Sequence, residues 1–417
     1  MYKELLSEAL AAANWSWDLL PQPVYLVGGA VRDALLGRKR EYLDLDFVVA
    51  KDAVEVARKI AKTYQAGFVL LDAERQIARV VFPGSTADFA QQEGDDLYTD
   101  LQRRDFTINA IAYNPHTQEI IDPLNGCVDL DQKIMRMISP QNLADDPLRL
   151  LRGYRQAAQL GFSVEEKTRV TIRTLAPRLS EVATERSRVE LGYMLANAEG
   201  TPWLQSAGED GLLKDLFPSA NRESWAKLSV VDDAAAELAA MYPGIDSYLQ
   251  AYLRDTLKTT WLAIAKIACL VNPQPDIAET ELQNLTYSRM EIKAVISALK
   301  LFPRLQAPLL SLREQYFLFQ ESGSTFLSTV VLAMAYRQPV EAIAPLICRY
   351  LNPNDLVAHT TPLLSGKELM IALNIAPSPL VGKLLTEIAI AQIEGKISTI
   401  QEAIAFAQEF LIGGMSG

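Results

Sequence analysis

Short apolar runs alternate with helix-like patterns between residues 24 and 113 of the chain. Apolar runs bounded by polar residues predict β-strands, whereas apolar residues that recur every three or four positions predict helices. The predicted strands cover 24–27, 45–49, 68–71, 78–82 and 108–113, and the predicted helices cover 30–37 and 51–64. This part of the chain is therefore expected to be a small mixed α/β domain.

After Ser139 apolar residues recur at helical spacing and β-branched runs become rare, which predicts helices. Within the segment 145–162, Asp146 suits a helix N-cap, Pro147 the first helical position and Gly161 the helix end. Residues 1–20 predict an amphipathic helix, and linkers are predicted at 197–211, 241–244 and 272–276. The expected fold class is α+β, an α/β domain followed by a helical remainder.

The composition indicates a globular chain without a membrane anchor. Its 417 residues are 49% apolar, and the mean hydropathy is +0.05, which excludes a mostly disordered protein. No apolar stretch reaches the roughly 18 residues that a membrane span needs. The first residues include Glu4, Glu8 and Asp18, unlike the acid-free apolar run of a secretory leader. We therefore expect a cytoplasmic protein.

Cysteine and histidine usage excludes several site classes. The three cysteines, Cys127, Cys269 and Cys348, are far apart, so they predict neither a disulfide framework nor a CxxC metal site. The two histidines, His116 and His359, are also isolated. Zinc hydrolases and His-Asp metal phosphohydrolases need clustered imidazoles and are excluded.

The chain is acidic overall but contains a basic segment. Forty basic and 51 acidic side chains give a net charge of −11, whereas general nucleic-acid binders are usually basic. Residues 149–188 hold nine Lys/Arg against four Glu, while residues 201–417 hold sixteen bases against twenty-two acids. Any nucleic-acid contact is therefore expected to depend on a local patch near the middle of the chain.

The first candidate site follows the strand at 24–27. Gly28 and Gly29 end that strand and a helix follows, so backbone N–H groups can approach an anion. Arg32 lies one turn into the helix, from where it could reach a triphosphate. The alternative is an ordinary tight turn between a strand and a helix.

The second candidate site is the pair Asp44 and Asp46. At positions i and i+2 of a strand, both carboxylates project from the same face. Two like charges on a largely apolar strand are costly unless cations share them, and a pair of Mg²⁺ ions would do so. The alternative is a solvated strand end that carries two acids. Asp88 could be a third carboxylate of this site or a structural acid.

The third candidate is Arg103, Arg104 and Asp105, which precede the strand predicted at 108–113. Arg104 could bind phosphate, and Asn109 within that strand could bind a sugar hydroxyl. A charged turn that enters a strand explains the same residues equally well.

The fourth candidate is a helix face that carries Asp146, Arg149, Arg152 and Arg155. Steps of three keep all four side chains on about a third of the helix circumference. An Asp accepts hydrogen bonds and an Arg donates several in a rigid fork, so such a pair can read the Watson–Crick edge of a base. The alternative is a basic, solvated helix face.

Together these segments resemble one family. The sequences VGGAVRDALLG, DLDFVV, RRDFTINAIAY, IIDPLNGCVDL, DDPLRLLRGYRQAAQLGF and TERSRVEL are similar to those of the class II tRNA nucleotidyltransferases. That family comprises CCA-adding enzymes and bacterial poly(A) polymerases of the DNA polymerase β-like superfamily. Residues 365–404 also resemble the tail of this family.

The resemblance implies a fold and a set of roles. It implies a nucleotidyltransferase head at 1–138, a neck at 139–205, a helical body at 206–340 and a tRNA-binding tail at 341–417, the last three all helical. It implies that Asp44 and Asp46 hold Mg²⁺, and that the nucleotide is bound by Gly28, Gly29, Arg32, Arg104, Asp105, Asn109, Asp146, Arg149, Arg152 and Arg155. Within that set, Asp146 and Arg149 would select the base.

The segment between Asp88 and Arg103 predicts the subtype. Relatives that add the terminal adenosine carry a longer flexible loop here, and this segment looks too short to contain one. The expected activity is therefore addition of two cytidines to tRNA from CTP, beside a separate A-adding enzyme. The alternatives are a full CCA-adding enzyme that also uses ATP, an A-adding enzyme, a poly(A) polymerase, or a non-catalytic RNA-binding protein on the same shell.

Overall fold

The computed structural model describes residues 16–38, 42–254, 258–306 and 310–413. The chain divides into two compact units, Met1–Leu191 with Ser206–Asp215 and Gly192–Gln205 with Leu216–Gly417. Most of the helix predicted at 1–20 lies outside the described residues; within them, Trp17–Leu19 forms the 3₁₀ turn η1. No helix in the described part of the chain is both long and apolar enough to cross a membrane.

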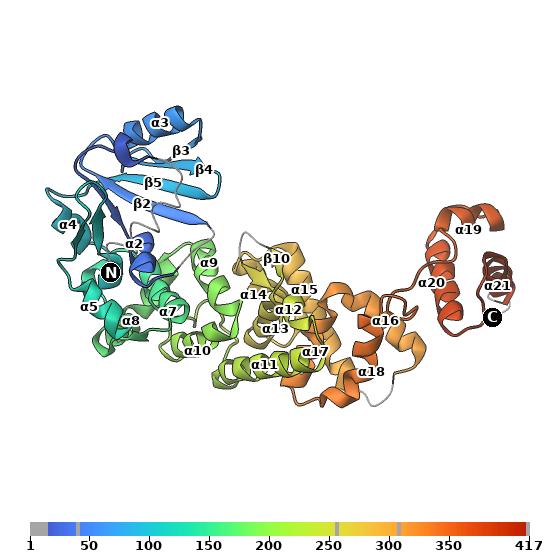
Figure 1. The fold of residues 1–417 in the computed structure, drawn as a ribbon. Coiled ribbons are helices and arrows are strands. Elements are labelled where there is room, and N and C mark those ends of the chain that lie inside the picture. The colour runs from blue at the N-terminus through green and yellow to red at the C-terminus, as the bar shows by residue number, and fades with distance from the viewer. Residues whose placement is uncertain (1–15, 39–41, 255–257, 307–309, 414–417) are drawn as a thin grey trace. The chain divides into compact units, whose positions relative to one another are not determined.

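A seven-stranded sheet forms the centre of the first unit (Figure 1). Its spatial order is β3-β4-β5-β2-β1-β6-β7. Neighbouring strands are antiparallel except β2 and β5, which are parallel. The strands are β1 (Val24–Val27), β2 (Leu43–Val49), β3 (Gly67–Asp72), β4 (Ile77–Phe82), β5 (Ser85–Gln91), β6 (Ala112–Asn114) and β7 (Glu119–Ile121).

Four of the five predicted strands are confirmed as β1 to β4. The strand predicted at 108–113 is wrong, because residues Thr107–Asn109 form the 3₁₀ turn η2 and only Ala112–Asn114 form β6. Ile108, Ala110 and Ile111 are all buried. The run is therefore apolar because its side chains are buried, not because its backbone is extended. The sequence did not predict β5, because Ser85, Thr86 and Ala87 are small or polar although all three are buried.

Helices flank the sheet and continue the first unit. Helix α3 packs across β3, β4 and β5. The two short strands β8 (Ile134–Met135) and β9 (Ser163–Val164) pair in parallel. The helices are α2 (Gly29–Leu35), α3 (Ala53–Tyr64), α4 (Leu97–Gln102), α5 (Gly126–Gln132), α6 (Pro140–Asp145), α7 (Leu148–Leu160), α8 (Glu166–Leu175), η3 (Ala176–Glu181) and α9 (Thr184–Leu195), whose last residues belong to the second unit.

The predicted end of α7 at Gly161 is confirmed, but the predicted start is one residue too early, because Pro147 rather than Asp146 is the N-cap and α7 begins at Leu148. Asp146 has an extended backbone, and its Oδ1 accepts a hydrogen bond from the N–H of Leu148 at 3.3 Å. Gly161 ends the helix with φ +70°, a conformation that favours glycine.

Strand β2 separates an apolar face from an acidic one. Leu45, Phe47 and Val49 are buried on one face, where Phe47 stacks on Phe89 of β5 with ring centroids 5.1 Å apart. Asp44 and Asp46 project from the opposite face, because side chains alternate along a strand. Further along this second face, Val48 packs with Val27, Leu101, Ala110 and Ala112. The two acids therefore lie beside a well-packed core that holds their strand in place.

The second unit is mostly helical, which confirms the α+β class. The prediction that residues after 139 are all helical is wrong in detail, because β9 and the pair β10 (Tyr252–Arg254) and β11 (Thr259–Thr260) are strands. The linker predicted at 197–211 is also wrong, since it contains η4 (Ala198–Gly200) and α10 (Thr201–Glu209). The remaining helices are α11 (Arg222–Met241), α12 (Ile245–Gln250), α13 (Trp261–Leu270), α14 (Pro275–Asn284), α15 (Arg289–Leu301), η6 (Phe302–Gln306), α16 (Leu312–Ser322), η7 (Gly323–Thr325), α17 (Phe326–Ala335), α18 (Val340–Leu351), α19 (Gly366–Leu373), α20 (Pro379–Ile393) and α21 (Ile400–Gly413).

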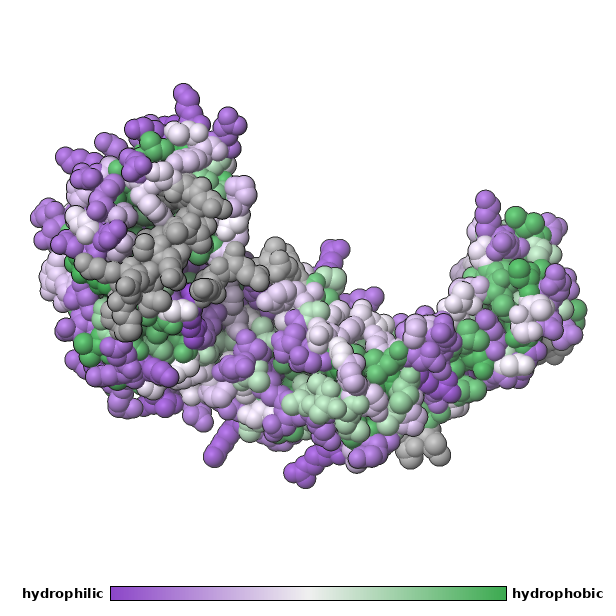
Figure 2. Space-filling view, in the orientation of Figure 1, coloured by the Kyte–Doolittle hydropathy of each residue, from purple (hydrophilic) through white to green (hydrophobic). Residues whose placement is uncertain are grey.

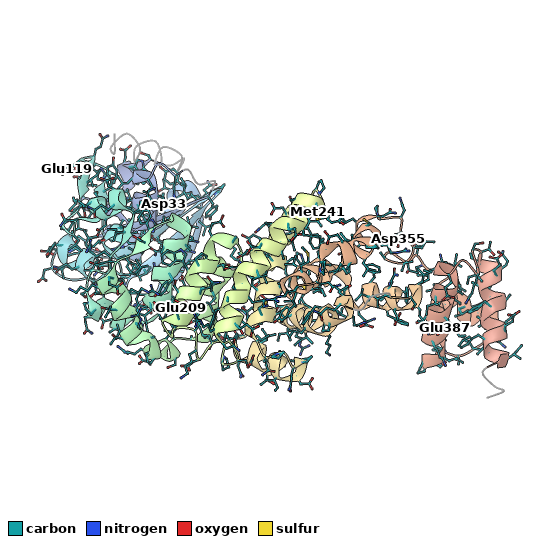
Figure 3. The ribbon with its side chains drawn as sticks, turned by 90° about the horizontal axis from the view of Figure 1, so that it is seen from below. Asp33, Glu119, Glu209, Met241, Asp355 and Glu387 are labelled. Carbon is teal, nitrogen blue, oxygen red and sulfur yellow. The ribbon has the colours of Figure 1, made fainter. Side chains whose placement is uncertain are left out.

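The last three helices share a small core of their own. Leu369, Leu384, Ile388 and Ala403 are buried between α19, α20 and α21. Hydrophobic side chains also reach the surface of these helices (Figure 2), with Ile371 at 73% exposure the most open. In Figure 3, Glu387 marks α20, where its carboxylate accepts two hydrogen bonds from Arg313 of α16.

Candidate active site

The two predicted metal ligands lie together on the open face of β2. Asp44 and Asp46 are both exposed, while Leu45 between them is buried. The hydroxyl of Thr86 donates to Asp44 Oδ1 at 2.5 Å. Asp46 faces Val27 of β1 and is the register partner of Asp88 on β5. Neighbouring strands on both sides therefore fix the direction of both carboxylates.

The charge on Asp46 is incompletely compensated. Its carboxylate reaches solvent, but protein atoms surround it on most sides. This partial desolvation, together with the charges of Asp88 and Asp44, raises the pKa of Asp46 to about 6. Arg104 and Arg79 oppose that rise. Such a group favours a cation beside it.

Asp88 is adjacent to this pair but is bound by an arginine. Arg79 on β4 donates from Nε to Asp88 Oδ1 at 2.7 Å and from Nη2 to Oδ2 at 2.8 Å. The hydrogen bond to Asp88 raises the pKa of Arg79, as expected for a bidentate pair. The sequence analysis did not predict this pair, because the two residues meet only through the pairing of β4 with β5.

Gly28 permits a close approach to Asp46. Its backbone has φ +73° and ψ −138°, which a residue with a side chain rarely adopts. A Cβ atom at this position would lie 3.2 Å from Asp46 Oδ2 and 3.7 Å from a guanidinium nitrogen of Arg104. At Gly29, a Cβ would lie 3.6 Å from Arg32 Nη2. The glycine pair therefore adjoins the β2 carboxylates and two of the predicted nucleotide-binding arginines.

A buried chain of hydrogen bonds starts at Arg32. Its Nη1 donates to Asn109 Oδ1 at 2.7 Å, and its Nε donates to Asp33 at 2.9 Å. Figure 3 labels Asp33, which follows Arg32 in α2. Asn109 Nδ2 in turn donates to Asp105 and to Gln156, each at 2.9 Å. The network joins α2, η2 and α7 and brings three of the predicted residues together.

The network continues from Asp105 to α7. Arg152 Nη2 lies 3.3 Å from Asp105 Oδ2. Although burial opposes ionisation, Arg152, the amide of Asn109 and the N–H of Phe106 hold the pKa of Asp105 below its ordinary value. Asp105 above all raises the pKa of Arg152, and Asp46 also contributes. Arg152 therefore interacts with the charge of Asp46 on β2 as well as with that of Asp105. No sequence signal pointed to Asp33 or Gln156 as members of this network.

Arg104 retains donor capacity next to the glycine pair. Its Nη2 donates to Asp100 at 3.2 Å. Its Nε is buried and has no hydrogen-bond partner among the described residues. A buried, unsatisfied guanidinium donor of this kind fits an anionic ligand.

Three of the four residues that were predicted to face the base lie on α7, Asp146 lies just before it, and the set is partly paired. Asp146 Oδ2 lies 3.2 Å from Arg186, and Arg155 pairs with Glu190. Arg186 and Glu190 lie four residues apart on α9, so one face of that helix contacts both ends of the α7 face. Arg149 donates to the backbone carbonyls of Arg103 and Asn142. The segment TERSRVEL was among the sequence segments that resemble the family, but these two contacts were not predicted.

The carboxylates of Asp44 and Asp46 form a donor set that suits a divalent metal ion. No cluster of three or more His, Cys, Asp or Glu side chains suited to a metal occurs in the part of the chain that the structure describes. Asp44 and Asp46 nevertheless supply two exposed carboxylates on one face. Mg²⁺ is usually held by one or two carboxylates together with substrate phosphates, so this donor set fits.

The chain between β5 and α4 is a short, anchored turn. Strand β5 ends at Gln91 and α4 begins at Leu97. Asp96 caps α4 by accepting from the N–H of Thr99 at 2.8 Å. The N–H of Glu93 donates to Asp100 at 3.1 Å, and the Glu93 carboxylate pairs with Arg103. These bonds explain why the turn is compact. The sequence predicted that this segment is too short for a long flexible loop.

Three family descriptions match separate parts of the chain. "Poly A polymerase head domain" matches residues 24–136, and "Probable RNA and SrmB-binding site of polymerase A" matches residues 161–223. A tRNA nucleotidyltransferase domain 2 matches residues 255–407.

Whole-length relatives agree with these matches. The chain is 49% identical over 399 residues to a CC-adding tRNA nucleotidyltransferase of Synechocystis, covering 94% of each protein. It is 31% identical to a CC-adding tRNA nucleotidyltransferase of Geobacter sulfurreducens, covering 91% of this chain and 90% of the relative. A solved CCA-adding enzyme in complex with CTP has the same fold, with a TM-score of 0.74 at 21% identity over 100% of this chain and 99% of its own.

Proposed function

Since the chain belongs to the class II tRNA nucleotidyltransferase family, we propose that it adds two cytidines to the 3′ end of immature tRNA from CTP, releases pyrophosphate, and stops before the terminal adenosine. The observation that carries the subtype is the turn of residues 92–96, which leaves no room for a long loop between β5 and α4. The two CC-adding relatives support the same assignment.

The chemistry is an in-line transfer of a cytidylyl group. The 3′ oxygen of the tRNA forms a bond to the α-phosphorus of CTP, and the bond between that phosphorus and the bridging oxygen of pyrophosphate breaks. Mg²⁺ bound by Asp44 and Asp46 would favour the ionised hydroxyl and offset the charge of the leaving pyrophosphate. The metal requirement is a proposal supported by the exposed carboxylate pair.

The nucleotide's phosphates would lie beside the glycine pair. Backbone N–H groups at Gly28 and Gly29 can approach them closely, and Arg104 has a free buried donor there. Arg32 lies beside Gly29, where its guanidinium can add positive charge. Asn109 and Asp105 would orient the ribose, with Arg152 as the ion-pair partner of Asp105.

The base would be selected by side chains of the protein. Asp146 offers acceptor oxygens and Arg149 offers donors, which together complement the Watson–Crick edge of cytosine. Arg152 and Arg155 would lie beside them along α7. No nucleic-acid template is then needed.

The proposed partners are the acceptor end of tRNA, CTP and a separate A-adding enzyme that completes the product. An acidic chain of net charge −11 fits recognition of one compact RNA shape rather than general RNA binding. A CCA-adding enzyme of Thermotoga maritima with the same fold (TM-score 0.68, 21% identity, covering 98% of this chain and 94% of its own) was solved with tRNA. We also propose that the enzyme acts in the cytoplasm. The division of the chain into head, neck, body and tail is proposed as well.

Product sequencing tests the proposal. The protein is incubated with Mg²⁺ and tRNA that lacks its 3′ CCA, with CTP alone, ATP alone, or all four nucleotides. A further reaction offers ATP alone to tRNA that ends in CC. We expect exactly two added cytidines in both reactions that contain CTP and none with ATP alone. A CCA end would indicate a full CCA-adding enzyme, adenosine added to tRNA that already ends in CC would indicate an A-adding enzyme, and an A tail would indicate a poly(A) polymerase. Retained tRNA binding without incorporation would indicate a non-catalytic RNA-binding protein.

A further inference from the structure

Asn142 of α6 clamps the chain segment that carries Arg104, the predicted phosphate-binding arginine. Its side-chain Nδ2 donates to the carbonyl oxygen of Gln102 at 2.6 Å and to that of Arg104 at 2.7 Å. Both partners are acceptors, so the amide must present its NH₂ group to them. The side chain is only 8% exposed, and Ser139 fixes the backbone N–H of the same residue at 3.2 Å.

The same contacts hold Arg149. Its Nη1 donates to the carbonyl of Arg103 and to the carbonyl of Asn142, each at 2.9 Å. Arg103 lies between the two residues whose carbonyls Asn142 binds. The two oxygens that receive Arg149 therefore belong to the two segments that the Asn142 side chain ties together.

We infer that Asn142 is a positioning residue for nucleotide selection, acting through Arg149. This inference rests on the proposed function, in which Arg149 reads the incoming base. A guanidinium is planar, so two hydrogen bonds to one of its terminal nitrogens set the plane of the whole group. Its Nε and Nη2 donate to none of the described residues, which leaves them available to a ligand in a fixed direction. Loss of the clamp frees the two carbonyls to move apart and releases that direction.

The variants Asn142→Ala and Asn142→Asp test the inference. Asn142→Asp keeps the shape but sets a carboxylate oxygen against two carbonyls, whereas Asn142→Ala removes the clamp without adding charge. The measurement is kcat/KM for single additions of CTP, ATP and UTP to tRNA lacking CCA. We expect the ratio of CTP to ATP to fall by about tenfold in either variant, since a directed contact to a base contributes about 1–3 kcal/mol of discrimination.

Two further proteins separate a specific effect from a loss of stability. Asn221→Ala removes the N-cap of α11, where Asn221 accepts from the N–H groups of Glu223 and Ser224 in the second unit. It should lose comparable stability and keep the CTP to ATP ratio. In an Arg149→Gln background, Asn142→Ala should change the ratio no further, because its effect passes through that arginine.

The outcomes distinguish the inference from the proposal beneath it. If Arg149→Gln leaves the ratio unchanged, the proposed base-reading role of Arg149 fails. If Arg149→Gln lowers the ratio while a folded Asn142→Ala keeps it, the inference about Asn142 is overturned alone. An additive loss in the double variant would also overturn it. Because Asn142→Asp buries a charge and can fail to fold, Asn142→Ala decides the question if only one variant is recovered.

Discussion

Asp46 and Asp88 are register partners on the parallel strands β2 and β5, yet their carboxylates have different environments. Asp88 directs both oxygens to the guanidinium of Arg79. Asp46 lies beside Gly28 and has its pKa raised to about 6, chiefly by partial desolvation. Of these two carboxylates, the one with the raised pKa is therefore the one beside the glycine pair.

The first prediction concerns the carboxylates of β2. Asp44→Asn and Asp46→Asn should each lower CTP incorporation by at least about 100-fold, because each removes a carboxylate that is proposed to hold the Mg²⁺ beside the reacting phosphate. Filter binding should show that both variants still bind tRNA.

Asp52→Asn is the matched control for these substitutions. Asp52 is exposed just after β2 and has φ +58°, a conformation that asparagine tolerates well. Its activity should stay within twofold of the wild type. Full activity in Asp44→Asn would refute the assignment of this residue as a metal ligand.

The second prediction concerns Gly28. Gly28→Ala should abolish most activity, because the new Cβ would strain the backbone and lie 3.2 Å from Asp46 Oδ2. Gly84→Ala introduces a similar positive-φ strain at +81°, but nothing lies within 4 Å of its Cβ. Both variants should lose about 1–2 kcal/mol in denaturant unfolding, and only Gly28→Ala should lose incorporation. Equal activity in the two proteins would contradict a role for this close approach.

The third prediction concerns the fork of Arg32. Lysine cannot bond Asn109 and Asp33 at once as this guanidinium does. Arg32→Lys should therefore lower kcat/KM for CTP by about tenfold or more, in steady-state assays with saturating tRNA. Arg38→Lys is the control, since among the described residues the side chain of Arg38 donates only to the carbonyls of Gln159 and Leu160. A wild-type value in Arg32→Lys would show that the fork is dispensable.

Strands and helix ends that have local signals in the sequence could be predicted from the order of apolar and polar residues alone. The acids of β2 were predicted on one face because Leu45 and Phe47 mark the opposite face. The C-terminal end of α7 was predicted from Gly161, whereas its start was predicted one residue too early.

Features that depend on distant parts of the chain could not be predicted in this way. Strand β5 is buried although its first residues are small or polar, so its burial comes from β2 and β4 on either side. The pair of Arg79 with Asp88 follows from strand register. Asn109 was placed in a strand because its neighbours are apolar, whereas it lies in a buried turn that directs its amide to Asp105.

The fourth prediction concerns pH. Asp210 has only 2% of its side chain exposed, and it accepts hydrogen bonds from Tyr154, Arg169 and Arg173. Burial opposes ionisation, but these three donors hold the pKa of Asp210 below its ordinary value. A carboxyl whose pKa is lower in the folded state stabilises the fold above its unfolded pKa of about 3.9. That contribution is lost as the pH falls through the folded pKa.

Asp210→Asn should therefore lower the free energy of unfolding by about 3 kcal/mol at pH 7. The difference from the wild type should shrink as the pH falls below about 4. Urea unfolding of the first unit's signal at pH 7, 5 and 3.5 measures both effects. Asp95→Asn, at an exposed position of the turn, should show neither. A difference that stays constant with pH would exclude an ionised Asp210 as the source.

The parallel pairing of β2 with β5 also has a consequence for synthesis. Adjacent parallel strands need a crossover connection, which here consists of α3, β3 and β4. A chain emerging from the ribosome thus displays Asp44 and Asp46 well before Thr86 and Asp88 exist to orient them. The face of the sheet that carries both acids is therefore complete only after translation has passed Gln91.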